Sequence, residues 1–250
     1  MTSLTPTIRL VAFTGSTNAD LLADRTAREG AWLVARRQRA GRGRAGRPWS
    51  DGAGNFMGST VVNLRQGDPP AHTLALVAGL AAFEAVAAEP GRPRDLILKW
   101  PNDLLVGTAK LAGVLLEREE ERVVVGIGVN LAGAPPLTYR ASTALAEHGP
   151  VPPLETFAAT LADGFASLLS RWQGGDWSSL RAAWLARAHP AGTPLAVRDG
   201  SGRQLVGGFL GLAEDGAALL RLADGDTRVI HAGDVELVGE RMVGGDAAGG

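Results

Sequence analysis

The sequence predicts an α+β protein, in which a mixed, largely antiparallel sheet is backed by helices and followed by a small all-β module. Short apolar segments in the first 130 residues indicate strands, and longer segments with apolar residues at helical spacing indicate helices. The last quarter of the chain carries three Asp-Gly pairs between short apolar runs, a pattern that indicates successive hairpins. Strands and helices that are partly segregated along a chain are typical of the α+β class.

The first 64 residues predict three strands, one helix and one long loop. Ser16 and Thr17 cap a helix that we expect to run to about Arg28 and to end at Gly30. Residues 41–54 contain five glycines and a proline, too many for a regular element, so this segment is predicted to be a loop. The predicted strands cover residues 8–13, 32–35 and 55–64.

The following residues predict further strands, three helices and the small module. Helices are expected over residues 71–89, 157–172 and 177–188, and strands over residues 96–100, 104–106, 110–118 and 122–130, with a hairpin turn at Gly107-Thr108. Beyond residue 190, Asp199-Gly200, Asp215-Gly216 and Asp224-Gly225 predict a small β-barrel. The expected domains are therefore residues 1–189 and 190–240, with a disordered tail at residues 241–250.

The composition is that of a soluble globular protein and argues against several function classes. The 250 residues are 45% hydrophobic and 20% charged, and a net charge of −1 provides no global field to attract nucleic acid or an anionic membrane. Cysteine is absent, which excludes disulfides and thiolate metal sites. The four histidines are scattered without ligand spacing, so no dedicated metal site is evident.

No segment predicts secretion or membrane insertion. The first ten residues lack a basic region followed by an apolar run. The longest apolar stretch, residues 74–88, contains Glu84 and is too short to cross a bilayer. We therefore expect a cytoplasmic protein.

A strong bias in the basic residues indicates where function lies. Only Lys99 and Lys110 are lysines among 25 basic residues, and asparagine occurs just five times. Both lysines fall near one predicted hairpin, in the segments 99–103 and 110–117, where a strand-end lysine beside a polar turn suits a phosphate. A lysine that prevents edge-strand aggregation is the simpler interpretation. Since arginine would serve that purpose equally well, the rarity of lysine favours a functional role.

The loop at residues 36–49 is the second candidate. Six arginines fall within twelve residues on a glycine-rich segment, and arginine binds carboxylate and phosphate with two parallel hydrogen bonds. Trp49 could stack on a planar ring. A solvated basic loop or a nucleic-acid patch is equally open at this point. The glycines at 41, 43 and 46 fit a dinucleotide-binding pattern only by spacing, because loop and strand follow where that motif needs a helix.

Two further segments carry weaker signals. Gly126, Gly128 and Asn130 close an otherwise apolar strand, and glycine within a strand marks the close approach of a ligand, another backbone or a neighbouring side chain. Ser16-Thr17-Asn18 is, taken alone, a helix cap.

Together, these segments resemble the biotin–protein ligase family, in the family's order and over almost the whole chain. The motifs are Ser16-Thr17-Asn18, Gly41-Arg42-Gly43-Arg44 with Gly46-Arg47 and Trp49, Lys99-Trp100-Pro101-Asn102-Asp103 with Lys110-Leu111-Ala112-Gly113, and Gly126-Ile127-Gly128-Val129-Asn130. The resemblance implies a catalytic domain like that of class II synthetases and an SH3-like C-terminal barrel. It also implies an AMP-forming biotin–[acetyl-CoA-carboxylase] ligase that uses ATP and Mg²⁺, with biotin as substrate and a biotin carboxyl carrier protein as partner.

The resemblance further implies roles for individual residues. Lys110 near the α-phosphate, Arg42 at the biotin carboxylate and Asp103 beside the incoming lysine would be catalytic. Biotin would be bound by Ser16, Thr17, Gln38, Gly41, Arg42 and Gly113. ATP or the adenylate would be bound by Arg44, Arg47, Trp49, Lys99, Asn102, Lys110 and Asn130.

Other functions are disfavoured by the same motifs. Some family members carry an N-terminal DNA-binding domain, but only fifteen residues precede Ser16, so we expect a ligase without repressor activity or nucleic-acid binding. A lipoate–protein ligase is the main alternative enzyme, and it is expected to lack the Gly-Arg-Gly-Arg run at 41–44. A nucleic-acid-binding protein would need aromatic residues among the charges, and the chain is only 5% aromatic. Pairing of sheet edges would give a homodimer, which the sequence leaves open.

Overall fold

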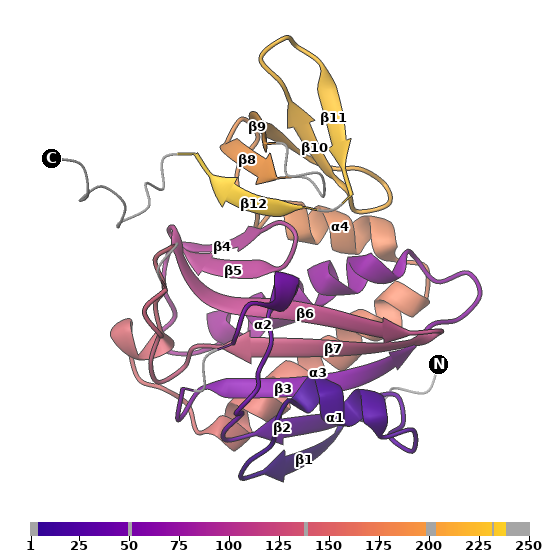
Figure 1. Cartoon of the computed structure of the whole chain (residues 1–250), viewed down its shortest axis with the longest axis vertical. Coiled ribbons are helices and arrows are strands. Elements are labelled where there is room, and N and C mark those ends of the chain that lie inside the picture. The colour runs from indigo at the N-terminus through magenta and orange to yellow at the C-terminus, as the bar shows by residue number, and fades with distance from the viewer. Residues whose placement is uncertain (1–4, 50–51, 138–139, 199–203, 232, 239–250) are drawn as a thin grey trace, which may run out of the picture.

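The structure, a computed structural model, describes residues 5–49, 52–137, 140–198, 204–231 and 233–238. A seven-stranded sheet carries helices on both faces, and a separate sheet of C-terminal strands packs against one end (Figure 1). This arrangement confirms the predicted α+β class. The strands of the large sheet are β1 (Thr7–Val11), β2 (Ala31–Ala35), β3 (Phe56–Asn63), β4 (Leu96–Lys99), β5 (Asp103–Val106), β6 (Ala109–Glu119) and β7 (Arg122–Val129).

The large sheet is mixed, as predicted, with only one parallel pair. Its strand order is β1-β2-β3-β7-β6-β5-β4, so β7 and β6 occupy the centre. Strands β1 and β2 run parallel, and every other neighbouring pair is antiparallel. The predicted hairpin at Gly107-Thr108 joins β5 to β6 and is confirmed.

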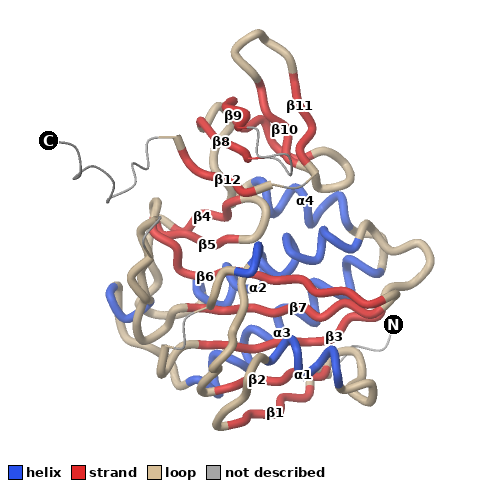
Figure 2. The backbone as a smooth tube through the Cα atoms, viewed as in Figure 1, coloured by secondary structure: helices blue, strands red, loops and turns tan. Residues whose placement is uncertain are grey.

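One face of the sheet holds the main hydrophobic core. Helices α2 (Leu74–Ala87) and α3 (Leu154–Gln173) lie behind the strands in the view of Figure 2, and α4 (Trp177–Leu185) packs on both of them next to the C-terminal strands. Phe157 and Phe165 of α3 pack against Phe56 and Trp32 of the sheet in edge-on ring contacts. The predicted helix over residues 71–89 begins as a short 3₁₀ turn, Ala71–Thr73, before α2.

The opposite face is covered at one end by a short helix, α1 (Thr17–Ala23), whose Leu21 packs on Leu33, Val61 and Val124. Ser16 caps α1 as predicted, by accepting a hydrogen bond from the backbone of residue 19.

The predicted extension of this helix to residue 28 is wrong. Asp24 accepts hydrogen bonds from both the backbone and the hydroxyl of Thr26, which forms a turn in place of another helical turn. The Arg122 guanidinium then binds the carbonyl oxygens of residues 21, 24 and 27, so the chain satisfies these acceptors without continuing the helix.

The C-terminal strands form a five-stranded antiparallel sheet in the order β11-β10-β9-β8-β12. They are β8 (Pro194–Arg198), β9 (Gln204–Leu212), β10 (Ala218–Arg221), β11 (Thr227–Ile230) and β12 (Asp234–Leu237). The predicted turns at Asp215-Gly216 and Asp224-Gly225 join β9 to β10 and β10 to β11. Asp199-Gly200 and the tail at 241–250 lie outside the described residues, and the domain boundary at 189/190 stays a prediction.

The turn between β9 and β10 anchors this module to the large sheet and its helices. Four side chains from outside the module bind backbone carbonyls at or next to this turn. Trp100 Nε1 donates to the carbonyl of Gly216 at 3.0 Å, and Trp177 Nε1 to that of Glu214 at 2.6 Å. His72 binds the carbonyl of residue 215, and Arg181 binds that of residue 212.

No helix among the described residues is both long and apolar enough to cross a bilayer.

Phe157→Ala should lower the free energy of unfolding by about 3–5 kcal/mol. The Phe157 ring is fully buried and contacts Phe56 with a centroid distance of 5.6 Å. Urea unfolding followed by tryptophan fluorescence measures the loss. Thr160→Ala, on the exposed side of the same helix, is the control and should change stability by about 0.5 kcal/mol or less. Equal losses in the two variants would contradict the packing of α3 on the sheet.

Candidate active site

A single row of paired residues crosses five strands of the large sheet and defines the site. Lys99 on β4 pairs with Asp103 on β5, Asp103 with Gly113 on β6, Gly113 with Gly128 on β7, and Gly128 with Met57 on β3. Residues directly opposite one another on neighbouring strands present their side chains to the same face. The register therefore places a lysine and an aspartate beside two positions that carry no side chain.

A β-bulge brings the second lysine to this face. Leu104 pairs with Ala112 and Leu105 with Lys110, which leaves Leu111 as an extra residue on β6. Because of this insertion, Leu111 and Ala112 both enter the hydrophobic core. The alternation of side chains is reset, and Lys110 points to the opposite face, toward Asp103.

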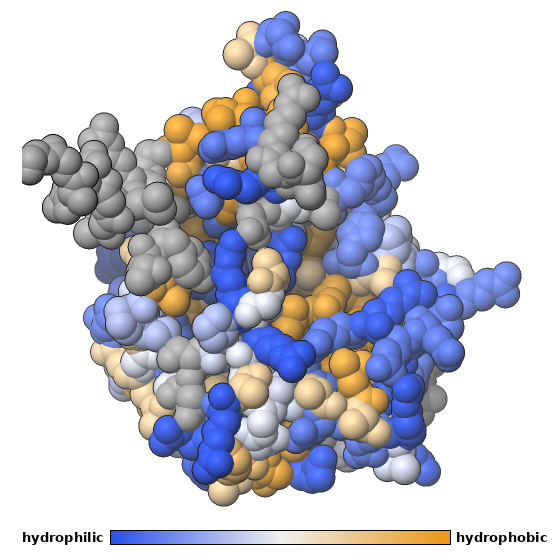
Figure 3. Space-filling view, in the orientation of Figure 1, coloured by the Kyte–Doolittle hydropathy of each residue, from blue (hydrophilic) through white to orange (hydrophobic). Residues whose placement is uncertain are grey.

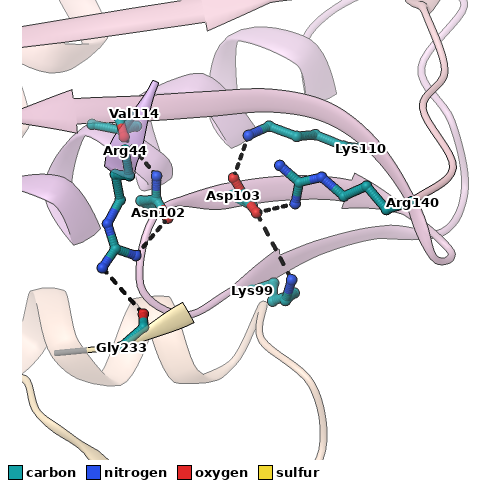
Figure 4. A network of polar contacts seen from close by, with 8 residues as sticks. All are labelled: Arg44, Lys99, Asn102, Asp103, Lys110, Val114, Arg140 and Gly233. Atoms are coloured by element: carbon teal, nitrogen blue, oxygen red, sulfur yellow. Dashed lines mark hydrogen bonds and ion pairs between the residues drawn. The ribbon is translucent and has the colours of Figure 1, made fainter. Parts of the chain in front are cut away.

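Asp103 gathers three cationic side chains around one buried carboxylate (Figure 4). Its Oδ1 lies 2.6 Å from Lys110 Nζ, and its Oδ2 lies 2.5 Å from Arg140 Nη1 and 3.9 Å from Lys99 Nζ. Arg140 comes from the segment between β7 and α3, far from the other three in sequence. Three cations around one anion make this end of the site suitable for a second anionic group.

Burial and charge act in opposite directions on the ionisation of this cluster. Burial alone would raise the pKa of Asp103, but the charges of Lys110, Arg140 and Lys99 outweigh it and hold that pKa well below its usual range. Burial lowers the pKa of Lys110 below its ordinary value, and the charge of Asp103 only partly compensates. An incoming anion would favour the charged form of Lys110.

The loop at residues 36–49, which we call the arginine loop, lies against the site. Arg44 donates to Asn102 Oδ1 at 3.3 Å and to the carbonyl of Gly233 at 3.1 Å, so it joins the large domain to the C-terminal module (Figure 4). Asn102 in turn donates to the carbonyl of Val114 at 2.6 Å. These contacts support the interpretation of residues 36–49 as part of a site.

Trp49 lies against the sheet at the two glycines of this row, Gly113 and Gly128. A Cβ atom at Gly128 would lie 2.4 Å from the indole of Trp49, so only glycine leaves room for this ring. At Gly113, a Cβ atom would lie 2.6 Å from Lys110 Nζ, so that position makes room for the lysine amine. The glycines of the strand motif thus accommodate neighbouring side chains, one of the interpretations that the sequence left open.

A group of buried polar residues forms the other end of the site. Gln38 Oε1 accepts a hydrogen bond from the backbone N–H of Thr17 at 2.7 Å, which ties the start of α1 to the segment after β2. Gly41 lies next to Gln38, and its carbonyl accepts a hydrogen bond from the backbone N–H of Trp49.

Asn130 supports the cationic end of the site. It is buried and donates to the backbone carbonyls of Thr143 and Lys110, which steadies the segment that follows Arg140.

One cavity unites these two ends. Of the residues expected at the site, all except Gly41 line it, and hydrophilic residues gather in the centre of this face, beneath the C-terminal module (Figure 3). Arg42 and Arg47 line the cavity where the arginine loop borders it. The cavity is also lined by Arg140, Ser59 and the C-terminal residues at 235–236, which the sequence did not predict. Arg140 belongs to no motif, so only the fold reveals its contact with Asp103.

The comparison with known proteins agrees with this geometry. Residues 10–132 match the profile of the biotin/lipoate A/B protein ligase family, and residues 192–238 match the biotin protein ligase C-terminal domain. The chain is 40% identical over 244 residues to the biotin–[acetyl-CoA-carboxylase] ligase of Paracoccus denitrificans, covering 90% of this chain and 98% of that protein. The chain belongs to the biotin–protein ligase family.

Further relatives place the chain in the same family. The biotin–[acetyl-CoA-carboxylase] ligase of Mycobacterium tuberculosis is 36% identical over 236 residues, covering 90% of this chain and 87% of that protein. A biotin protein ligase structure from Aquifex aeolicus, in complex with biotin and ATP, superposes with a TM-score of 0.82 at 25% identity, covering 92% of this chain and 98% of that one. The family profile spans biotin and lipoate ligases, and these relatives are biotin ligases.

Asp103→Asn should lower the free energy of unfolding by about 3–5 kcal/mol at pH 7, because it leaves the buried Lys110 and the largely buried Arg140 without their counter-ion. The pKa of Asp103 is depressed in the folded protein, so its contribution is complete above its ordinary pKa of 3.8 and fades as the pH falls further. Urea unfolding at pH 7 and at pH 3 should therefore show a smaller difference between variant and parent at pH 3. A difference that is the same at both pH values would contradict this ionisation.

Proposed function

We propose that the protein activates biotin with ATP to form biotinyl-5′-AMP and then transfers biotin to a lysine of a biotin carboxyl carrier protein. The observation that carries this proposal is the single cavity that joins a buried polar end, at Thr17 and Gln38, to a cationic end, at Lys110 and Arg140. Such a cavity suits a substrate with an uncharged polar ring at one end and a reacting carboxylate and phosphate at the other.

The two ends divide the substrates between them. The ring of biotin would lie at the end formed by Ser16, Thr17 and Gln38, with its carboxylate toward Arg42 and Lys110. The nucleotide phosphates would lie near Arg44 and Arg47, the adenine beside Trp49, and Lys99, Asn102 and Asn130 would hold the nucleotide or the residues around it. Gly113 would leave room for biotin at the boundary between the two, and Gly41, outside the cavity lining, would leave room for Gln38 and Trp49.

In the first step, the biotin carboxylate oxygen attacks the α-phosphorus of ATP, and the bond to the β-phosphate oxygen breaks to release pyrophosphate. Negative charge increases on the oxygens of the α-phosphate during this attack. Lys110 and Arg140 are fixed in place by Asp103 before substrate arrives, so they can stabilise that charge without reorganising.

In the second step, the lysine amine of the carrier attacks the acyl carbon of the mixed anhydride, and AMP leaves. Asp103 would lie beside this amine. A carboxylate whose pKa is held far below its usual range is a weak base, so Asp103 would assist mainly by attracting and orienting the amine. The proton would pass to solvent or to the departing phosphate.

Magnesium would enter with the nucleotide. Among the described residues, no three His, Asp or Glu side chains cluster as a metal site, and the carboxylates lining the cavity are Asp103, already paired with cations, and Glu236. These residues fit phosphate better than a divalent cation, so Mg²⁺ would be held by the phosphates of ATP.

The carrier of acetyl-CoA carboxylase is the proposed partner, and the cytoplasmic location, the absence of nucleic-acid binding and the homodimer stay predictions.

Mixing the purified protein with Mg-ATP and either biotin or lipoate tests the function. Mass spectrometry should detect biotinyl-AMP, with release of pyrophosphate, and no lipoyl-AMP. A lipoyl adenylate instead would move the specificity to the other branch of the family. The absence of both adenylates would refute the proposed activity.

Lys110→Ala should reduce the rate of biotinyl-AMP formation by about 100-fold or more, because it removes a fixed charge at the α-phosphate. Circular dichroism should show an intact fold, since Arg140 still pairs with Asp103. The matched control is Arg118→Ala, which removes an exposed cation from the same strand and should leave the rate unchanged. A rate near that of the parent in Lys110→Ala would refute the role assigned to this lysine.

A further inference from the structure

A chain of hydrogen-bonded side chains runs from the buried polar end of the cavity to Glu117, a half-buried residue of β6. Thr17 Oγ1 lies 2.7 Å from Ser59 Oγ, Ser59 Oγ lies 2.6 Å from Asn18 Oδ1, and Asn18 Nδ2 lies 2.8 Å from Glu117 Oε2. Thr17, Ser59 and Asn18 are each at most 4% exposed, and all three line the cavity. We call Asn18, Ser59 and Glu117 the relay.

The direction of every hydrogen bond in the relay is set from its Glu117 end. A carboxylate can only accept, so the Asn18 amide must turn its NH₂ group to Glu117 and its oxygen to Ser59. The Ser59 hydroxyl must then donate its single proton to Asn18. In the remaining contact, Ser59 can only accept, so the donor is the Thr17 hydroxyl.

This direction determines what the cavity offers to a ligand. The Thr17 hydroxyl proton is committed to Ser59 at 2.7 Å, in preference to the longer 3.1 Å contact with Gln38 Oε1. The Thr17 oxygen therefore presents lone pairs, and Gln38 Oε1, 3.1 Å away, is an acceptor as well, which already accepts from the Thr17 backbone N–H. Two adjacent acceptors in a buried site favour a ligand group that donates a hydrogen bond.

We propose that Asn18, Ser59 and Glu117 are positioning residues that keep Thr17 as a hydrogen-bond acceptor, and that they thereby select a substrate ring carrying an N–H donor. This inference rests on the proposed function, in which the ring of biotin, a cyclic urea with two N–H groups, occupies this end. The dithiolane ring of lipoate has no N–H group. A buried site built to pair with an N–H discriminates strongly against a ligand that lacks it, because the Thr17 oxygen then gains no donor from the ligand.

Gly126 gives the relay the space that it needs. A Cβ atom at this position would lie 2.2 Å from Asn18 Oδ1 and 2.9 Å from Asn18 Cγ. The glycine pairs with Ser59 across β3 and β7, so the sheet register brings the two positions together. Gly126 therefore contributes to ligand selection through the space that it leaves for Asn18.

A double-mutant cycle tests the relay. Ser59→Ala and Thr17→Val should each weaken biotin binding, measured by calorimetry, by about tenfold. The double variant should bind no more weakly than the poorer single variant, because Ser59 acts only through Thr17. In pyrophosphate-release kinetics the KM for biotin should rise, while the KM for ATP changes less than about threefold. Additive losses in the cycle, or unchanged affinity in Ser59→Ala, would overturn the proposal.

A charge exchange at the far end of the relay gives an independent test. Asn18→Asp places two carboxylates together and should raise the KM for biotin. Adding Glu117→Gln restores a donor for the new aspartate, whose other oxygen still accepts from Ser59, so the double variant should recover biotin affinity to within about threefold. Glu119→Gln, an exposed position two residues along the same strand, is the control and should rescue nothing. Failure of Glu117→Gln to rescue would contradict the assigned hydrogen-bond direction.

The outcome for the relay is separate from the outcome for the proposed function. Absence of biotinyl-AMP formation by the parent protein would refute the function, whereas formation of the adenylate together with additive losses in the cycle would refute only the relay. Calorimetry with biotin alone measures the effect of the relay on biotin affinity without any reaction.

Discussion

The contact between the Asp103 carboxylate and its cations organises the active site. Lys110 and Lys99 are buried and Arg140 is largely buried, and these cations would repel one another without an anion among them. They come from separate strands and from a segment without regular structure, and Asp103 is the anion that their side chains share. The result is a fixed positive site, assembled before any phosphate arrives, which is the arrangement that electrostatic catalysis requires.

The sheet makes this arrangement possible through its register. The row from Lys99 to Gly128 places two charged side chains beside two glycines. The bulge at Leu111 turns Lys110 toward the space above these glycines. Without this bulge, the regular alternation of side chains along β6 would turn Lys110 into the hydrophobic core. The same face, two positions along β7, accommodates Asn18 over Gly126. A single sheet surface therefore serves the cationic end of the cavity and the end that selects the ring.

The sequence predicts much of this architecture because its motifs are local. The strands, the hairpin at residues 107–108 and the residues of the 99–103 and 110–113 segments follow from short patterns and from the rarity of lysine. The end of helix α1 does not, because Arg122, about a hundred residues away, takes the carbonyl oxygens that would otherwise continue the helix. Arg140 and Ser59 are likewise invisible, since each has an ordinary surrounding sequence and acquires its role only through a distant partner. The bulge depends on pairing between strands, which no single strand encodes.

The central claim is that Asp103 holds Lys110 ready for the phosphate of the adenylate. Because Lys99 and Lys110 are the only lysines in the sequence, labelling with ¹⁵N-lysine gives side-chain ammonium signals from these two alone, and Lys99→Arg identifies which is which. A pH titration followed by NMR should place the pKa of Lys110 below the ordinary lysine value in the free protein, and biotinyl-AMP should raise it. An ordinary pKa that does not respond to the adenylate would contradict this account of the site.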